Sequence, residues 1–336
     1  MAKIFITGVA GFLGSHLADE LLIKGHEVVG IDNLLGGYKD NVPGKVKFYK
    51  ADARDFEKMK TLMKGVDVLY HCAAAPHEGL SVFSPNLITQ HTYNSTVAAA
   101  SAAVVCKVKR IVFCSSMARY GEQEKLPFTE DMQPKPKDPY GVAKYAAELA
   151  VKALCNAHGL EYVNAVPHNI IGPRQKYDDP YRNVASIMIN MMLQGRQPII
   201  YGDGEQKRGF SFVEDVVEPM VKMGFEPQVV GETINVGPDE EFITINELAG
   251  RIAKLIGFKP LKPTFVKDRP MEVKLATCSA DKCRKLLGYK THYTIDQGLK
   301  EMIAWIKKRG TKPFTYHLAL EIINDKTPAT WKDRLF

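Results

Sequence analysis

Three side chains in the first half of the chain could carry out proton chemistry together. Tyr140 and Lys144 stand four residues apart, so on a helix both side chains lie on one face. An ammonium group one turn from a tyrosine favours the phenolate, and we expect Lys144 to lower the pKa of Tyr140 towards neutral pH. Ser116, at the end of a predicted strand, supplies a hydroxyl that would complete the site. Taken alone, the tyrosine–lysine spacing also fits an exposed helix pair.

A glycine-rich turn near the N-terminus predicts a nucleotide site. Gly8, Gly11 and Gly14 follow the apolar run 4–6 and precede the amphipathic stretch 15–24. Strand, glycine turn and helix form the context of a dinucleotide-binding fingerprint. The glycines let the backbone approach a pyrophosphate, and the start of the helix directs free N–H groups at it. Glycines at these positions also fit ordinary turns.

Asp32 narrows the choice of nucleotide. It ends a second predicted strand, 18 residues after Gly14. A carboxylate there accepts hydrogen bonds from the ribose hydroxyls of adenosine and repels a 2′-phosphate, so it favours NAD over NADP. The alternative is a turn residue at the end of the strand. After the third and fourth strands, Asp52 could meet the adenine, and the small side chains of Ala73 and Ala74 would let the cofactor lie on the backbone.

Length and composition restrict the number of domains, the compartment and the partners that we expect. The 336 residues, 45% of them hydrophobic, suit one large domain or two joined ones, and no stretch reaches the ~18 apolar residues of a membrane span. The N-terminus runs directly into a strand, and six cysteines include no C-x-x-C pair, so we expect a cytoplasmic protein without a metal site.

Positive charge concentrates in residues 251–336. It could face phosphates, an anionic membrane or nucleic acid, but a solvated surface explains most of it, and we expect no nucleic-acid partner.

The order of the predicted elements indicates an α/β fold. Such alternation is typical of a Rossmann-type, doubly wound parallel sheet, in which ligands bind at the carboxyl ends of the strands. We predict a first lobe over 1–170, a smaller substrate-binding lobe over 171–311 with some chain exchange, and a docked tail over 312–336. The expected strands are 4–6, 27–31, 46–50, 66–72, 110–115 and 161–166. The expected helices lie near 12–24, 55–64, 86–106, 140–157, 180–194, 213–225, 244–256 and 295–308.

These motifs, in this order, resemble the extended short-chain dehydrogenase/reductase family, and within it the nucleotide-sugar epimerases of the UDP-galactose 4-epimerase type. The resemblance covers about residues 2–308. It implies NAD as the cofactor, Tyr140 as the catalytic base, Lys144 on the nicotinamide ribose and Ser116 on the sugar 4-hydroxyl. It further implies a UDP-sugar substrate, a homodimer formed through a helix pair, and a role in polysaccharide biosynthesis.

The resemblance also implies two sets of contacts. In the substrate set, Asn169 would contact sugar or phosphate, and Arg208 and Arg269 would clamp the diphosphate. We expect the substrate to contact Ser116, His168, Asn169, Arg208, Arg269 and Ala276. We expect NAD to contact Gly8, Gly11, Phe12, Leu13, Gly14, Asp32, Asn33, Asp52, Ala53, Ala73, Ala74, Ser115, Tyr140, Lys144 and Pro167.

The implied reaction is inversion at sugar C4 through a transient 4-keto sugar, with tightly held NAD and no net redox change. Met117 and Ala118 stand where related 4,6-dehydratases carry an Asp-Glu pair and decarboxylases a Glu, so both activities are disfavoured. The small Ala276 would leave room for an N-acetyl group. Alternatives that remain are a net oxidoreductase, a 3,5-epimerising reductase that uses His168, and a non-catalytic NAD-binding scaffold.

Overall fold

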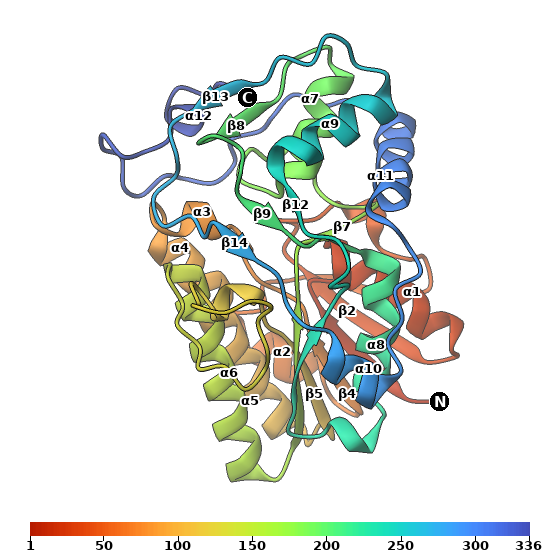
Figure 1. Cartoon of the computed structure of the whole chain (residues 1–336). Coiled ribbons are helices and arrows are strands. Elements are labelled where there is room, and N and C mark those ends of the chain that lie inside the picture. The colour runs from red at the N-terminus through yellow and green to blue at the C-terminus, as the bar shows by residue number, and fades with distance from the viewer.

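A central parallel sheet organises the first half of the molecule. The computed structural model describes all residues, 1–336, and Figure 1 shows its ribbon coloured along the chain. Seven strands pair in the order β11-β6-β5-β4-β1-β2-β3, and every pair is parallel. The predicted fold class is confirmed. The strands are β1 (Lys3–Thr7), β2 (Glu27–Asp32), β3 (Lys47–Lys50), β4 (Val68–His71), β5 (Arg110–Cys114), β6 (Glu161–Pro167) and β11 (Thr233–Val236).

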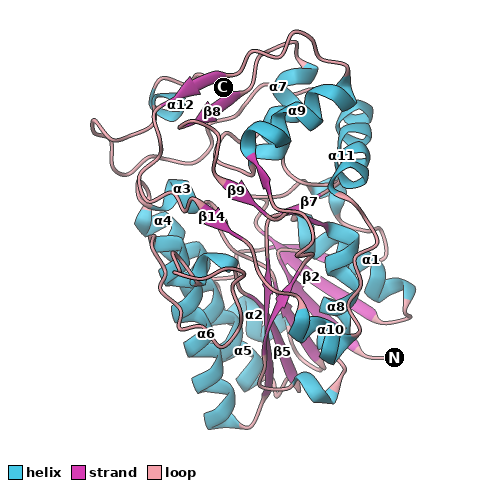
Figure 2. Ribbon diagram, in the orientation of Figure 1, coloured by secondary structure: helices cyan, strands magenta, loops and turns pink.

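Helices cover both faces of this sheet because its strands are apolar on both sides (Figure 2). Alternate residues of a strand point to opposite faces. Ile4 and Ile6 accordingly pack on one face, and Phe5 on the other. The first face carries α1 (Phe12–Ile23), α8 (Val213–Met223) and α10 (Asp281–Leu287), and the second carries α2 (Phe56–Leu62), α5 (Ser95–Val105) and α6 (Pro139–His158).

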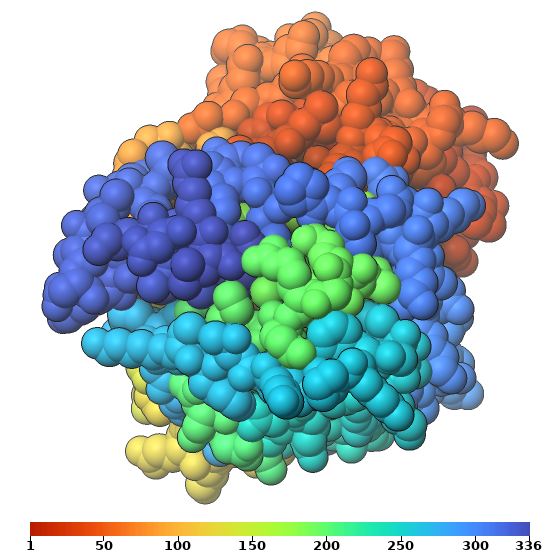
Figure 3. Space-filling view, turned by 90° about the horizontal axis from the view of Figure 1, so that it is seen from above, coloured from red at the N-terminus to blue at the C-terminus, as the bar shows by residue number.

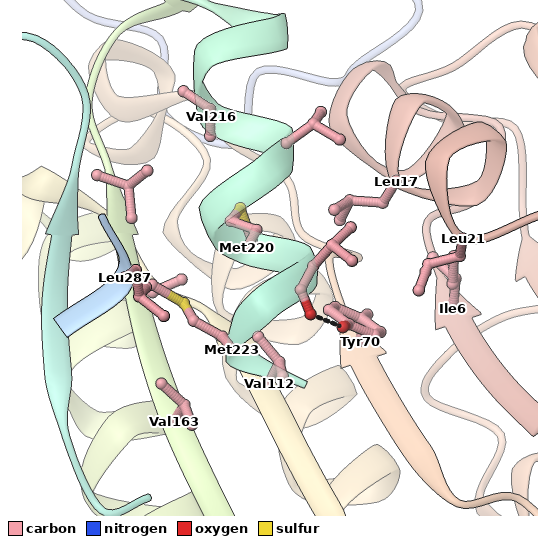
Figure 4. Packing of buried hydrophobic residues seen from close by; sticks show 14 of the residues in the cluster. Ile6, Leu17, Leu21, Tyr70, Val112, Val163, Val216, Met220, Met223 and Leu287 are labelled. Carbon is pink, nitrogen blue, oxygen red and sulfur yellow. Dashed lines mark hydrogen bonds between the residues drawn. The ribbon is translucent and has the colours of Figure 1, made fainter. Parts of the chain in front are cut away.

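Part of the first lobe comes from late in the sequence. Figure 4 shows α8, with Met220, packed beside α1, with Leu17, and these residues belong to a cluster of 27 buried residues. The hydroxyl of Tyr70 donates a hydrogen bond of 2.8 Å to the carbonyl of Val221 and joins β4 to α8. Strand β11 also returns to this sheet. The chain therefore crosses between the lobes more than once, and the domain boundary at residue 170 stays a prediction.

The smaller lobe lies beyond the carboxyl ends of the strands (Figure 1). Its core joins three helices, two of which begin with capping boxes, at Thr244 with Glu247 and at Thr294 with Gln297. The helices are α7 (Val184–Leu193), α9 (Ile245–Ile256) and α11 (Ile295–Arg309). Short strands complete the lobe and its junction with the first: β7 (Ile170–Ile171), β8 (Ile199–Tyr201), β9 (Lys207–Arg208), β10 (Ser211–Phe212), β12 (Ile243–Thr244), β13 (Thr264–Val266) and β14 (Leu275–Ala276).

The structure adds detail to two of the predicted regions, the helix over 86–106 and the tail over 312–336. The helix expected over 86–106 is divided into α4 (Pro85–Thr89), a π-helical turn at Gln90–Asn94, and α5. The segment 312–336 packs on the molecule through Leu318 and Trp331, and it contains the short helix α12 (Ala329–Lys332). Figure 3 shows this deep blue segment against the green part of the chain. None of the helices combines the length and the apolar character that crossing a membrane requires.

Candidate active site

Two cavities meet between the lobes. One, the sheet cavity, has a volume of about 300 Å³ and lies over the carboxyl ends of the central strands. The other, the lobe cavity, has a volume of about 220 Å³ and is lined mainly by the smaller lobe. Residues that line both mark their junction: Pro76, Glu78, Asn169, Arg182 and Asn183. A ligand that spans the two cavities would pass through this junction.

The glycine turn lines the sheet cavity and leaves room for a phosphate. Gly8 has a φ of +75°, and a Cβ on it would lie 2.9 Å from the backbone nitrogen of Ala73. A Cβ on Gly14 would lie 2.2 Å from the carbonyl oxygen of Gly8. Gly11 is the N-cap of α1 and supplies no side-chain cap, so the first N–H groups of the helix stay free. Free N–H groups and a bare backbone suit a pyrophosphate.

Two aspartates are held at the far end of the sheet cavity. Asp32 is buried, and its carboxylate accepts hydrogen bonds from the backbone N–H of Ala10 (3.0 Å) and of Leu34 (2.7 Å). Burial raises the pKa of Asp32, and these backbone bonds oppose the shift. Burial also acts to raise the pKa of Asp52, but hydrogen bonds from Arg54 and Asn33 outweigh it and hold the value at about 2. Both carboxylates and the glycine turn fit the adenosine and pyrophosphate of NAD.

Helix α6 positions the predicted catalytic pair. Its N-cap is Asp138, whose carboxylate accepts a hydrogen bond from the N–H of Gly141. Tyr140 and Lys144 follow on one face, are almost fully buried, and line the sheet cavity together with Ser116. The Nζ of Lys144 donates a 2.6 Å hydrogen bond to the carbonyl of Cys114 and lies 6.0 Å from the centre of the Tyr140 ring. The structure thus brings the three predicted residues to one wall.

The structure does not support the expected effect of Lys144 on Tyr140. Burial raises the pKa of Tyr140 well above its usual value, and a hydrogen bond from Ser116 opposes this only in part. The nearby groups of Cys114, Glu78 and Asp138 raise it further. Lys144 instead bonds to a backbone carbonyl, and burial lowers its own pKa. The i,i+4 spacing predicted the shared face but not the direction in which Nζ points.

A buried network supports the end of β5. Glu148, one turn beyond Lys144 on α6, accepts a hydrogen bond from the hydroxyl of Ser115. Its Oε1 also lies 2.9 Å from the Nε of Arg119, and both side chains of this ion pair are at most 7% exposed. The Ser115 hydroxyl therefore points towards Glu148, while Ser116 remains available to a ligand. Glu148 was not among the predicted site residues, although its spacing from Lys144 places it on the same face of α6.

The lobe cavity carries two arginines held by a single carboxylate. The Nη2 of Arg208 lies 3.3 Å, and the Nη2 of Arg269 2.6 Å, from oxygens of Glu272. Arg269 also stacks over the ring of Tyr201 at 4.6 Å. Two guanidinium groups with one carboxylate keep a net positive charge, which suits a diphosphate. Asn169, with a φ of +39°, donates a 2.9 Å hydrogen bond to the carbonyl of Gly209 at the cavity junction.

Two predicted substrate residues lie outside both cavities. His168 is fully buried, and its Nε2 donates a 2.9 Å hydrogen bond to the carbonyl of Pro238. Ala276 packs in a separate apolar cluster with Met117 and Cys278. The expected contacts of His168 and Ala276 with substrate therefore find no support, because neighbouring segments cover both side chains.

Most of the predicted contacts for cofactor and substrate do line a cavity. The fifteen residues expected to bind NAD all line the sheet cavity. Asn169, Arg208 and Arg269 line the lobe cavity, and Ser116 lines the sheet cavity. Arg182, Asn183 and Phe336 line the lobe cavity without having been predicted as contacts. Only the approach of segments far apart in sequence reveals them.

Comparison with known proteins assigns the family. The model of the NAD dependent epimerase/dehydratase family matches residues 4–237, and the chain belongs to that family. It is therefore an enzyme of an NAD-dependent class. It is 32% identical to the UDP-glucose 4-epimerase of Mycolicibacterium smegmatis over 92% of this chain and 99% of the relative.

Solved structures of epimerases share the fold of this chain. The UDP-glucose 4-epimerase of Thermotoga maritima, solved with UDP-glucose, superposes with a TM-score of 0.85 at 29% identity over 91% of this chain and 99% of that one. The UDP-glucuronic acid 4-epimerase of Bacillus cereus, solved with UDP-glucuronic acid and NAD, gives 0.85 at 28% identity over 92% of this chain and 100% of that one.

Proposed function

We propose that the protein inverts C4 of a UDP-hexose or UDP-N-acetylhexosamine, with NAD retained through each turnover. One observation carries the proposal. The proton-transfer residues Tyr140 and Ser116 line one cavity, the arginine pair lines the next, and the two cavities share five lining residues. A nucleotide sugar held at its diphosphate by Arg208 and Arg269 would reach Tyr140 with its hexose ring.

Each side chain of the site has a separate role in the proposed reaction. Bound NAD supplies reversible hydride acceptance at C4 of the sugar. Tyr140, once it is in its phenolate form, takes the proton of the 4-hydroxyl and later returns it, while Ser116 holds the same oxygen by a hydrogen bond. Lys144 holds the nicotinamide ribose. Arg208 and Arg269 anchor the diphosphate, so the ring of the 4-keto sugar can turn over without leaving the site.

Other reactions on the same fold receive less support. A 3,5-epimerising reductase would need His168 in the site, but its side chain lies outside both cavities. A dehydratase or a decarboxylase would need an acid directly after the catalytic serine, where Met117 and Ala118 stand. A net oxidoreductase remains the second candidate, because it would use the same Tyr140 and Lys144.

The proposal includes a homodimer that works in the cytoplasm. Val142 and Leu149 of α6 are each 51% exposed, on the helix that we expect to pair with its copy in a homodimer. Ala146 lies between them on the same helix and would permit close packing. All six cysteines are free, which suits the reducing cytoplasm. Nucleotide sugars made there would supply polysaccharide biosynthesis.

Whether the enzyme keeps its NAD bound distinguishes a 4-epimerase from a net oxidoreductase. The purified protein is incubated without added NAD, separately with UDP-glucose, UDP-N-acetylglucosamine and GDP-mannose, and the sugars are followed by NMR. We expect a C4-inverted UDP-sugar to accumulate to equilibrium. NADH that appears only after NAD is added, with no inverted sugar, would identify a dehydrogenase and contradict the proposal.

A further inference from the structure

Glu78 is the one carboxylate that lines both cavities. It is the first residue of α3 (Glu78–Ser81), directly after the loop that follows β4. Glu78 is exposed, and its side chain faces the cavity space. Neither carboxylate oxygen takes part in a hydrogen bond or an ion pair, and only its backbone carbonyl is used, by the hydroxyl of Ser81. The carboxylate is therefore free to meet a ligand at the junction.

The charged groups that face Glu78 are largely engaged with other partners. Glu272 holds both Arg208 and Arg269, as described above. The carboxylate of Asp138 accepts hydrogen bonds from the hydroxyl of Ser81 and the N–H of Gly141. Desolvation, reinforced by Asp138, raises the pKa of Glu78 to about 7, and the two arginines oppose the shift. The carboxylate of Glu78 is thus mostly charged above about pH 7 and mostly neutral below it.

The position of the hexose ring follows from the residues at its two ends, the catalytic residues of the sheet cavity and the arginines of the lobe cavity. Its 4-hydroxyl must reach Tyr140 and Ser116 in the sheet cavity, while its diphosphate stays with the arginines of the lobe cavity. The ring therefore lies at the junction, where Glu78 projects. To present both faces at C4 the ring must turn, and its C6 substituent then sweeps past the junction wall in at least one orientation.

We propose that Glu78 determines which sugar the enzyme accepts. It receives a hydrogen bond from a hydroxyl or an acylamino N–H group of a neutral hexose, and it excludes nucleotide hexuronates. A C6 carboxylate would meet Glu78 as a like charge inside the cavity, which is unfavourable. The inference rests on the proposed function, because it assumes that the ring turns at this junction.

The test compares a neutral with an acidic sugar on the same nucleotide. Dissociation constants and kcat/KM are measured for UDP-glucose and UDP-glucuronate at pH 8, with the wild-type protein and with Glu78→Gln. We expect the wild type to favour UDP-glucose by roughly tenfold or more, and Glu78→Gln to remove most of that preference. Glu57→Gln, the same change on the exposed surface of α2, is the control and should leave the ratio unchanged.

The pH dependence of the wild type gives a second readout that needs no variant. The preference for UDP-glucose should weaken from pH 8 to pH 6 as Glu78 becomes protonated, because the C6 carboxylate itself stays charged. Equal binding of both sugars at pH 8 would overturn the inference, even if C4 inversion is found. A binding preference that depends on Glu78 without any C4 inversion would refute the proposed function but uphold the role of Glu78.

Discussion

At the scale of single residues, burial defines the chemistry of the site. Tyr140 is 6% exposed, and its hydroxyl can exchange a proton only with a ligand or with Ser116, since no other hydroxyl or carboxylate bonds to it. The raised pKa of Tyr140 means that the side chain is a neutral phenol in this state of the protein. Tyr140 can therefore accept the proton of the sugar hydroxyl only after its own proton has left. A phenyl ring cannot replace it, because a phenyl ring can neither release nor accept that proton.

Removal of the Tyr140 hydroxyl should abolish turnover and spare the cofactor site. We expect Tyr140→Phe to lower kcat by roughly 10²- to 10⁴-fold, the usual contribution of a positioned acid or base. The NAD content, measured by absorbance after denaturation, should match that of the wild type. Tyr49→Phe, on β3 and outside both cavities, serves as the control. An unchanged rate in Tyr140→Phe would refute the assigned mechanism.

At the scale of elements, the C-terminal segment 312–336 completes the substrate side of the molecule. The indole of Trp331 donates a 3.2 Å hydrogen bond to the carbonyl of Pro180, beside the cavity-lining residue Tyr181. Glu321 accepts hydrogen bonds from the first N–H groups of α4. Phe336, the last residue, lines the lobe cavity. The segment therefore both supports the wall of the site and supplies part of it.

Truncation should separate these two contributions. A chain that ends at residue 311 loses the buried Trp331 and Leu318, and each buried apolar side chain is worth roughly 1.5–3 kcal/mol, so the melting temperature should fall. Phe336→Ala removes the cavity contact and the packing on Phe314 but leaves Trp331 and Leu318 in place. It should therefore lower the melting temperature less than the truncation does and raise KM for the UDP-sugar several-fold. Full activity and stability of the truncated chain would show that the segment has neither role.

At the scale of the whole molecule, several buried histidines tie stability to pH. His71 on β4 is 1% exposed, and its ring nitrogens bond to the hydroxyls of Thr7 (2.8 Å) and Thr96 (3.0 Å). Burial lowers its pKa to about 3. Burial likewise lowers the pKa of His77 and His168. In the unfolded chain each of these rings takes up a proton near pH 6.5, whereas in the folded protein each takes up its proton only at a lower pH.

The free energy of unfolding should therefore fall as the pH drops below about 6.5. Between that value and about 3, unfolded His71 binds one proton more than folded His71, which costs about 1.4 kcal/mol per pH unit. Urea unfolding at pH 7, 6 and 5 should show a shallower loss in His71→Gln than in the wild type. The exposed His158→Gln should follow the wild type. Parallel curves for all three proteins would contradict the assignment to His71.

Much of the architecture was predictable from local pattern. Six of the seven strands of the central sheet were predicted to within a few residues, because apolar alternation and the glycine turn act between neighbours in sequence. Strand β11 and helix α10, which come from late in the chain, were not predicted. The π-helical turn at Gln90–Asn94 was not predicted, since it leaves the side-chain pattern helical. Short helices such as α3 and α12 also carry too few residues to show a period.

By itself, the sequence determined most of the longer elements of the first lobe and the residues whose partners lie within one turn of helix or at one strand end. Tyr140, Lys144 and the three glycines belong to this class, because backbone geometry alone sets their relative positions. Tertiary structure decided the rest: the direction of the Lys144 ammonium, the burial of His168 outside the cavities, and the approach of Glu78 and Phe336 to the wall of one cavity. These depend on burial and on segments distant in sequence, and a local pattern carries no information about either.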